Sequence, residues 1–300
     1  MLADAVEQYP EISFTFDEAS DVLGYDLKEL AFNGPAEQLN QTVHTQPALL
    51  AASYAVWRIL WARAAVKPVV LAGHSLGEYT ALVCAGALEF CDAVKIVAAR
   101  GQFMQEAVTA GEGAMAAIIG LENADVTSLC DEIRQGSEVL SPANYNSIGQ
   151  VVIAGHYAPV QRAIDAAKTK GAKMAVMIPV SVPSHCDLMR PAAERLSALL
   201  DSVTINPTRL PILSNADVKP YTDAASIREG LVKQLYMPVR WVEIIQSFMQ
   251  MNAMNIIECG PGKVLTGLNK RIDKTLTLQS VYDLASIETI LSVSNERNAT

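Results

Sequence analysis

The fold is decided by the stretch Val69-Val70-Leu71-Ala72-Gly73-His74-Ser75-Leu76-Gly77-Glu78-Tyr79. An apolar run ends at Gly73, a serine follows, and the sequence continues in residues that favour a helix. In this context the pattern Gly-x-Ser-x-Gly predicts a strand, a sharp turn that carries a nucleophile, and a helix. We expect Gly73 and Gly77 to let strand and helix approach closely, so that the Ser75 hydroxyl stands clear of the sheet. An ordinary strand-to-helix turn is the alternative, because so short a motif also arises by chance.

Leu76, the residue after the serine, is a candidate for stabilising a reaction intermediate. Its backbone N–H would lie at the start of the predicted helix, where N–H groups have no partner within the helix. The helix dipole also favours negative charge at this end. Leu76 is therefore a candidate oxyanion donor beside Ser75.

The composition is that of a folded protein with a large core. The chain has 300 residues, 50% of them hydrophobic, and a mean hydropathy of +0.20. No stretch of about eighteen predominantly apolar residues predicts a membrane helix. The opening residues Met1-Leu2-Ala3-Asp4-Ala5-Val6-Glu7 lack the basic and apolar regions of a secretory signal. The net charge of −9 argues against binding to nucleic acid or to an anionic membrane.

The five cysteines are scattered along the chain and show no metal-ligand spacing. An odd number at irregular spacing favours reduced thiols over a disulfide framework. Reduced thiols are typical of cytoplasmic proteins, so we predict a cytoplasmic location and no metal site. The cysteines are Cys84, Cys91, Cys130, Cys186 and Cys259.

The order of predicted elements changes near residue 112. The order β-α-β-β-α-β follows, which is that of a small ferredoxin-like unit. We therefore predict an α/β fold with an α/β-hydrolase-like large subdomain, which holds a parallel sheet and the nucleophile elbow, and an inserted ferredoxin-like small subdomain. The large subdomain would span 1–111 and 181–300, and the small one 112–180. The small subdomain's strands are predicted at 114–119, 139–145, 150–154 and 173–178, and its helices at 124–134 and 158–170.

The large part is predicted to be mostly helical around a few strands. The nucleophile strand is 69–72, an extended segment is expected at 210–215, and a further strand at 255–258. The opening residues, 1–9, also have helix-like sequence. Other helices are predicted at 17–24, 26–32, 45–64, 78–85, 89–108, 188–200, 225–235 and 239–251.

A serine nucleophile needs a base, and the chain offers four histidines. His44 precedes a predicted helix, where a capping or surface role fits. His74 adjoins Ser75 but would project differently from the turn, and His156 follows a strand of the small unit and should be exposed. His185 lies in a proline-stiffened loop where the inserted unit returns to the main one, and such loops carry catalytic groups more often than other segments do. His185 is the candidate base, with a histidine bonded only to backbone as the alternative.

Arg100 is the most unusual charged residue. Its neighbours three and four positions away on the predicted helix are all apolar: Ile96, Val97, Phe103 and Met104. No carboxylate on that helix can therefore pair with it. A guanidinium on an apolar face is costly unless an anion reaches it, and its planar fork suits a carboxylate held by two hydrogen bonds. A distant Asp or Glu and a substrate carboxylate are both consistent with this pattern.

Several motifs lie along nearly the whole chain: Gly73-His74-Ser75-Leu76-Gly77-Glu78-Tyr79, Arg100-Gly101, Ser141-Pro142-Ala143-Asn144-Tyr145-Asn146, Val182-Pro183-Ser184-His185, Arg240-Trp241 and Glu258-Cys259-Gly260-Pro261-Gly262-Lys263-Val264-Leu265. Together they resemble the malonyl-CoA:acyl carrier protein transacylases of bacterial fatty acid synthesis. The resemblance implies two partners, malonyl-CoA and acyl carrier protein. It implies no cofactor beyond the coenzyme A thioester that is the substrate, and a monomeric protein.

The resemblance also implies roles for the candidate residues. Ser75 would take the malonyl group from coenzyme A as an ester and pass it to the phosphopantetheine thiol of acyl carrier protein. His185 would activate Ser75 and protonate the leaving thiolate, and the main-chain carbonyl of Gln234 would orient His185. Arg100 would hold the free malonyl carboxylate. Methylmalonyl-selective relatives often have Gln at the position of Leu76, so malonyl is favoured.

One part of the family pattern has no match. Relatives begin with a short strand and a Pro-Gly-Gln-Gly loop, whose glutamine N–H is the second oxyanion donor. Met1-Leu2-Ala3-Asp4 corresponds to the helix after that loop. Either the loop precedes the printed sequence or the chain is a truncated member of low activity. Two further alternatives are a serine thioesterase or hydrolase that uses Ser75 and His185, and a non-catalytic carrier-binding protein.

Overall fold

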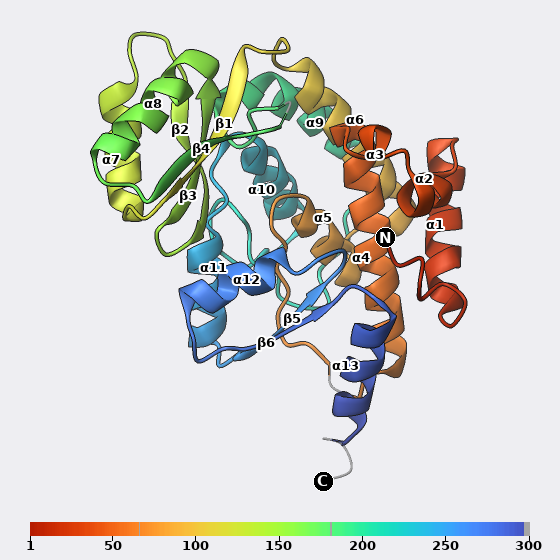
Figure 1. Cartoon of the computed structure of the whole chain (residues 1–300). Coiled ribbons are helices and arrows are strands. Elements are labelled where there is room, and N and C mark those ends of the chain that lie inside the picture. The colour runs from red at the N-terminus through yellow and green to blue at the C-terminus, as the bar shows by residue number, and fades with distance from the viewer. Residues whose placement is uncertain (66, 181, 297–300) are drawn as a thin grey trace.

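The computed structural model describes residues 1–65, 67–180 and 182–296. The predicted boundary residue Ser181 and the last residues, 297–300, lie outside this description. Figure 1 shows a helix-rich part, a four-stranded sheet with two helices against it, and a smaller group of strands and helices formed by the C-terminal segment. The chain has a mixed α/β fold, as predicted. Within the described ranges, no helix is both long and apolar enough to cross a membrane.

The helix-rich part is built around α4 (Thr42–Arg63), which is apolar on most of its circumference. It packs against α6 (Phe90–Glu106). The two helices approach closely because Gly101 has no side chain, since a Cβ there would lie 2.9 Å from the carbonyl oxygen of Thr42. This contact brings Arg100 of α6 to the first turns of α4. The other helices are α1 (Pro10–Leu23), α2 (Leu27–Asn33), α3 (Ala36–Leu39), α5 (Leu76–Cys84), η1 (Asp187–Met189), α9 (Arg190–Asp201) and α10 (Ala224–Tyr236).

Strands β1 to β4 form an antiparallel sheet in the order β2-β3-β1-β4. One face of the sheet is covered by α7 (Asn123–Ile133) and α8 (Tyr157–Thr169), and the core between them includes Ile118, Leu129 and Ile153. The sequence predicts all four strands and both helices in this order, within two residues at each end. The strands are β1 (Gly113–Ile119), β2 (Leu140–Ser147), β3 (Gln150–His156) and β4 (Met174–Ile178).

The C-terminal segment adds a parallel pair, β5 (Asn255–Cys259) and β6 (Thr277–Val281). Glu258 at the end of β5 accepts hydrogen bonds from the backbone N–H groups of Leu265 and Thr266, at 2.9 and 2.7 Å, and so caps the next helix. The sequence predicts β5 and α11, but not β6 and the two helices beside it. The helices of this segment are α11 (Trp241–Gln250), α12 (Val264–Ile272) and α13 (Leu284–Glu296).

The predicted strand before the nucleophile does not form as a regular strand. Within the described residues, 69–72 contributes only one parallel bridge, between Leu71 and Ile212. The Leu71 N–H donates to the carbonyl of Pro211 at 2.9 Å, so this segment has a hydrogen-bonded neighbour on one side. Val69 is 65% exposed. Pairing on one side over a single residue is too little to propagate a ladder, so the only parallel strand pair among the described residues is β5 with β6.

The predicted helix at 1–9 is wrong. Residues 3–8 form turns, and α1 begins at Pro10. Proline suits the first position of a helix because its missing N–H would have no partner there. It also disfavours helical geometry in the residue before it, and Tyr9 accordingly has an extended backbone (φ −123°, ψ 91°). The helix predicted at 17–24 is the second half of α1.

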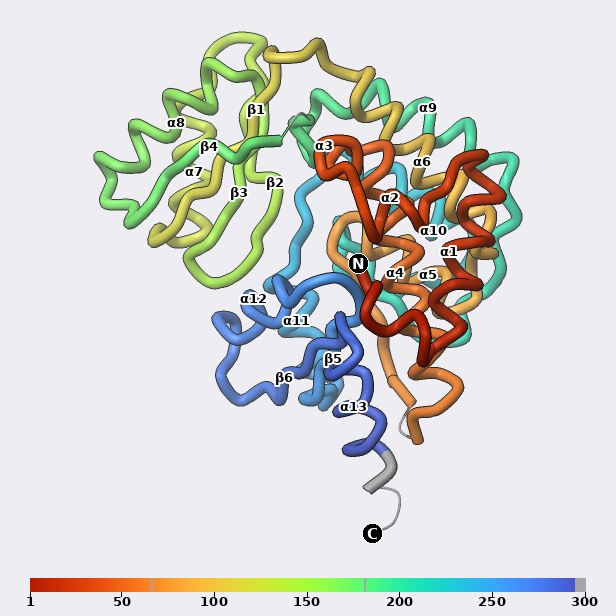
Figure 2. Tube along the Cα trace, turned by 45° about the vertical axis from the view of Figure 1, so that its right-hand side comes forward, coloured from red at the N-terminus to blue at the C-terminus, as the bar shows by residue number. Residues whose placement is uncertain are grey.

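Two connections link the helix-rich part to the four-stranded sheet. Figure 2 shows the chain entering the sheet after α6 and leaving it after β4. The connections touch, because a Cβ on Gly113 would overlap the ring of Pro183. The returning connection carries His185 back toward the start of α5.

Candidate active site

Ser75 occupies a strained turn at the start of α5. Its φ of 51° lies in the left-handed region, which non-glycine residues rarely adopt, and its side chain does not cap the helix. A Cβ on Gly73 would overlap the carbonyl carbon and oxygen of Gly77, so the close approach predicted for Gly73 is confirmed. The same prediction is wrong for Gly77, whose Cβ would meet no atom within 4 Å. The first turn of α5 packs directly against the backbone at Gly73, so a side chain is excluded at Gly73 and not at Gly77.

His185 lies beside this serine, 110 residues further along the chain. The distance from Ser75 Oγ to His185 Nε2 is 2.8 Å. His185 Nδ1 lies 2.7 Å from the carbonyl oxygen of Gln234. A carbonyl only accepts hydrogen bonds, so Nδ1 carries the hydrogen and Nε2 of the neutral ring is left to accept the serine proton.

The environment of His185 keeps the ring neutral. His185 is 3% exposed. Burial lowers the pKa of His185 to about 3, and the positive charge of Arg100 acts in the same direction. An uncharged imidazole is the form that can accept a proton from Ser75 at neutral pH.

Arg100 is buried beside the same hydroxyl. Its Nη1 donates to Gln46 Oε1 at 2.7 Å, and its Nη2 donates to Gln234 Oε1 at 2.9 Å. Nη2 also lies 3.2 Å from Ser75 Oγ. Arg100 is 2% exposed, yet among the described residues it forms no ion pair with a carboxylate, and its Nε has no hydrogen-bond partner. Neutral amides hold the guanidinium in place and leave its charge uncompensated by direct contact, which favours the substrate alternative for Arg100.

Two side-chain amides hold the backbone around Ser75. Asn215 Oδ1 accepts the Ser75 N–H at 2.7 Å, and Asn215 Nδ2 donates to the carbonyl of Gly73 at 2.7 Å. Gln234 Nε2 donates to the Ser75 carbonyl at 2.9 Å. Both amides are fully buried. They come from segments that lie 140 and 159 residues beyond the serine, so the turn is fixed by tertiary contacts.

Glu78, in the first turn of α5, ties these amides together. Its Oε1 accepts from the backbone N–H of Asn215 at 3.0 Å and from the Tyr221 hydroxyl at 2.6 Å. Its Oε2 accepts from Gln234 Nε2 at 2.5 Å. Burial raises the pKa of Glu78 to about 7, although all of these donors and the charge of Arg100 favour the ionised form.

The other histidines lie elsewhere, as the sequence predicts for His74. His74 Nε2 bonds Asn146 Oδ1 at 2.8 Å and so links the turn to β2. His44 lies inside α4 and bonds the hydroxyl of Tyr25, so the expected position before a helix is wrong. His156 ends β3 and is half-buried, because its Nδ1 accepts from the backbone N–H of Val139 at 2.9 Å. The expectation that it is exposed is wrong.

Sequence reasoning placed Ser75, Leu76, Arg100, His185 and Gln234 at the site, and the structure brings all five together. Leu76 is the first residue of α5, so its N–H points out of the helix start beside Ser75. The sequence does not predict the part played by the side chains of Gln46, Glu78, Asn215, Tyr221 and Gln234. Glu78 had a signal, because it lies in the first turn after the nucleophile elbow. Asn215 had none, because its partners are distant in sequence.

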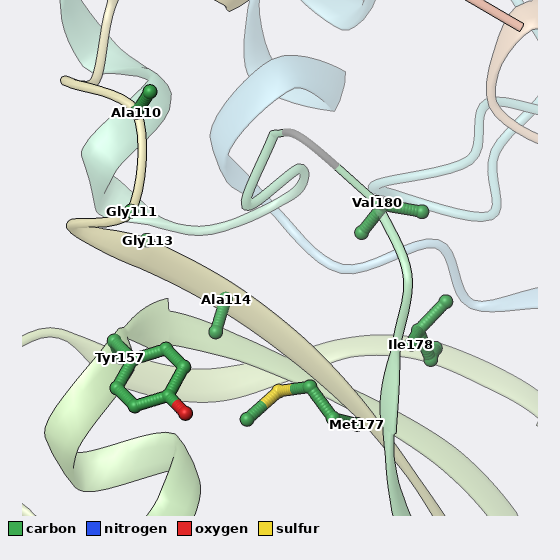
Figure 3. A pocket seen from close by; sticks show the side chains of 8 residues that line it. All are labelled: Ala110, Gly111, Gly113, Ala114, Tyr157, Met177, Ile178 and Val180. Carbon is green, nitrogen blue, oxygen red and sulfur yellow. The ribbon is translucent and has the colours of Figure 1, made fainter. Parts of the chain in front are cut away.

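A separate apolar hollow of about 230 Å³ lies where the chain enters and leaves the four-stranded sheet. Figure 3 shows Tyr157 and Met177 facing it from α8 and β4. No catalytic candidate lines it. Its lining residues are Ala110, Gly111, Gly113, Ala114, Tyr157, Met177, Ile178 and Val180.

The strained serine and its neutral histidine on a mixed α/β fold define a class, the proteins that transfer acyl groups through a serine. Residues 15–290 match the family model described as acyl transferase domain. Within this class, the chain belongs to the malonyl CoA-acyl carrier protein transacylase family.

The relatives that place it there match over almost their whole length. The Salmonella typhimurium malonyl CoA-acyl carrier protein transacylase is 51% identical over 292 residues, which cover 97% of this chain and 94% of that protein. The Bacillus subtilis protein of the same name is 44% identical and covers 97% and 92%. The crystal structure of an acyl carrier protein S-malonyltransferase from Vibrio cholerae is 53% identical, with a TM-score of 0.95 over 97% of this chain and 94% of that one. A malonyl-transacylase in complex with a type II PKS acyl-carrier protein is 50% identical, with a TM-score of 0.96 over 98% and 94%.

Proposed function

We propose that this chain transfers a malonyl group from coenzyme A to acyl carrier protein through an ester on Ser75. The observation that carries the proposal is the buried guanidinium of Arg100, 3.2 Å from Ser75 Oγ and without a carboxylate partner among the described residues. A guanidinium placed there matches an acyl group that ends in a carboxylate. The names of the relatives indicate the same reaction.

In the first half of the reaction Ser75 Oγ attacks the thioester carbonyl. His185 Nε2 takes the hydroxyl proton as the oxygen–carbon bond forms, and the N–H of Leu76 at the start of α5 donates to the oxyanion. The carbon–sulfur bond then breaks, and His185 returns the proton to the coenzyme A thiolate. The carbonyl of Gln234 accepts from Nδ1 throughout and stabilises the imidazolium. The second half runs in reverse, with the phosphopantetheine thiol of acyl carrier protein as the nucleophile.

Arg100 would hold the malonyl carboxylate in both halves. An acetyl group lacks that charge and would leave the guanidinium unpaired in a buried site. Leaving one member of a buried charge pair unpaired typically costs about 2–5 kcal/mol. This cost corresponds to a ratio of roughly 30-fold to several thousandfold between the rate constants for malonyl and acetyl transfer. We therefore assign the discrimination against uncharged acyl groups to Arg100.

The domain organisation is part of the proposal. We assign 112–180 to a ferredoxin-like small subdomain, supported by the strand order β2-β3-β1-β4 and by the two connections that join it to the rest. Residues 1–111 and 181–300 would form the α/β-hydrolase-like large subdomain. We also propose that a single chain acts in the cytoplasm, in keeping with its five free cysteines.

The test is a transfer assay with malonyl-CoA and holo acyl carrier protein. The chain should form malonyl-carrier protein with little release of malonate, and Arg100→Ala should lower kcat/KM for malonyl-CoA by about 100-fold while lowering that for acetyl-CoA much less. Release of free malonate without transfer would contradict the proposal and support the hydrolase alternative. Failure of both reactions in a folded chain would support the non-catalytic alternative.

A further inference from the structure

The sequence from Ser75 to Glu78 has the form of a capping box, a serine followed three residues later by a glutamate at a helix start. In that motif the serine hydroxyl bonds a backbone N–H of the first turn, and the glutamate bonds the backbone N–H of the serine. Neither bond forms between these two described residues. The Ser75 hydroxyl bonds His185, and the Ser75 N–H donates to Asn215. Glu78 is therefore released from capping, and its side chain points into the protein.

The carboxylate of Glu78 acts only as an acceptor. It is fully buried and receives three hydrogen bonds, from Tyr221, from the backbone of Asn215 and from Gln234. All three partners are donors. An ionised carboxylate satisfies them all. An amide would place its NH2 group against another donor, and the proton of a neutral acid could be accepted only by the Tyr221 hydroxyl, which would then lose its own bond to Glu78.

This property fixes the direction of the Gln234 side-chain amide. Nε2 lies between two acceptors, Glu78 Oε2 at 2.5 Å and the Ser75 carbonyl at 2.9 Å. The amide oxygen must then face the other way, toward Arg100, whose Nη2 donates to it at 2.9 Å. The same guanidinium nitrogen lies 3.2 Å from Ser75 Oγ. Glu78 and the Ser75 carbonyl together thus determine which atom of Gln234 Arg100 meets.

We propose that Glu78 is a positioning residue for Arg100. By fixing the Gln234 amide it directs the guanidinium at the acyl group on Ser75, and it thereby sets the preference for an acyl group that carries a carboxylate. The inference rests on the proposed function and adds a residue that does not touch the substrate.

The substitution Glu78→Gln tests the proposal because it keeps the size and removes the acceptor-only character. Its oxygen can still accept from Tyr221 and Asn215, but its NH2 group would face the NH2 group of Gln234. If the Gln234 amide turns over to avoid this, its NH2 group faces Arg100 and its oxygen faces the Ser75 carbonyl. The turned amide no longer offers an acceptor to the guanidinium, and the unturned amide is held by the Ser75 carbonyl alone.

The measurement is kcat/KM of the full chain for malonyl-CoA and for acetyl-CoA with the same acyl carrier protein. We expect Glu78→Gln to lower the malonyl-to-acetyl ratio by tenfold or more. Tyr221→Phe removes a different donor to the same carboxylate, and the Gln234 NH2 group still faces Glu78. This variant should therefore keep the malonyl-to-acetyl ratio within about threefold of the wild type, even if the protein is less stable. Glu243→Gln removes an exposed negative charge that pairs with Arg240, and it should leave both rate constants unchanged.

The outcomes separate this inference from the proposed function. If the wild type shows no preference for malonyl-CoA, the proposed function fails. If the wild type has the preference and folded Glu78→Gln keeps it within about twofold, only the role of Glu78 is overturned. An equal loss of the ratio in Tyr221→Phe would also overturn it, because general disruption of the network would then suffice.

A measurement on the wild type covers the case in which Glu78→Gln does not fold. Protonation of Glu78 removes the negative charge that the Gln234 NH2 group faces, so the malonyl-to-acetyl ratio should fall between pH 8 and pH 5. The ratio cancels steps common to both substrates, including protonation of His185. The charged and titratable groups that face Glu78 are Arg100 of α6, Tyr79 of α5 and Tyr221 before α10. A ratio that is constant over this range would overturn the proposal.

Discussion

The four-stranded sheet and the turn at Ser75 are held in place by different kinds of contact. The sheet is held by backbone ladders between neighbouring strands and by an apolar core under α7 and α8. The turn is held by side-chain amides and a carboxylate, Asn215, Gln234 and Glu78, from separate segments. The sheet therefore depends on local pattern and apolar area, and the site depends on a few polar atoms placed by the whole fold.

This difference separates stability from activity. A change in the sheet should alter the free energy of unfolding more than the chemistry. A change in the polar contacts around Ser75 should alter the chemistry more than the free energy of unfolding.

The largest effect is expected for His185→Ala. Loss of the group that accepts the serine proton should lower kcat/KM for malonyl transfer by about 10²- to 10⁴-fold. His44→Ala is the matched control, since the His44 ring bonds the Tyr25 hydroxyl, and it should stay within about threefold of the wild type. The measurement is the steady-state kcat/KM of both variants and of the wild type. Equal losses in both variants would mean that histidine removal acts through the fold.

Gly73→Ala should come next. Its Cβ would overlap the backbone of Gly77, so the turn must move and displace Ser75 from His185. A displacement of about 1 Å costs on the order of 100-fold in rate, and we expect kcat/KM to fall by that factor. Gly77→Ala adds a Cβ in open space on the helix, and it should keep or raise the free energy of unfolding. Wild-type kinetics in Gly73→Ala would show that the close approach does not position the nucleophile.

Gly155→Ala makes the same kind of overlap in the sheet. Its Cβ would overlap the carbonyl oxygen of Val139 at the start of β2. Forcing these strands apart should lower the free energy of unfolding by about 2–3 kcal/mol, as measured by denaturant titration. The rate of malonyl transfer by the folded fraction should change by less than about threefold. A loss of rate as large as that of Gly73→Ala would remove the contrast between the two regions.

The smallest effect is a pH dependence of stability. The pKa of His185 is about 3 in the folded protein and near its ordinary value of 6.5 in the unfolded chain. The unfolded chain therefore binds the extra proton between pH 6.5 and pH 3, and stability falls as the pH falls through this window. Between pH 7.5 and pH 5, the wild type should lose about 2 kcal/mol more than His185→Ala. The raised pKa of Glu78 has the opposite effect, because it lowers stability as the pH rises toward 7. Both proteins contain Glu78, so its contribution cancels when the stability change of His185→Ala is subtracted from that of the wild type.

The sequence predicted the sheet well because its signals are local. Apolar runs mark β1, β3 and β4, a turn at Asn146-Ser147-Ile148-Gly149 separates β2 from β3, and each strand pairs with segments of the same unit. It failed for the strand at 69–72, where an apolar run lacks a second hydrogen-bonded neighbour among the described residues. It also failed for β6, a short strand that is half polar.

At the candidate site, Ser75, His185 and Arg100 could be predicted from the sequence, and most of the side chains that hold them could not. Ser75 is marked by its glycines and Arg100 by a charge among apolar neighbours, and both signals are visible along one segment. The bond from Asn215 to the Ser75 N–H joins residues 140 apart, and no pattern within either segment reveals it. Glu78 carried a misleading signal, because the capping-box pattern predicts a bond that the structure replaces with contacts to distant donors.

The most direct test of ester formation on Ser75 is the intact mass of the chain after brief incubation with malonyl-CoA, before acyl carrier protein is added. We expect an added mass of one malonyl group that peptide mapping locates on Ser75. This mass should be removed when holo acyl carrier protein is added and should be absent in Ser75→Ala. An adduct of the same mass on Ser75→Ala, or release of coenzyme A by the wild type with no adduct on Ser75, would contradict ester formation on Ser75.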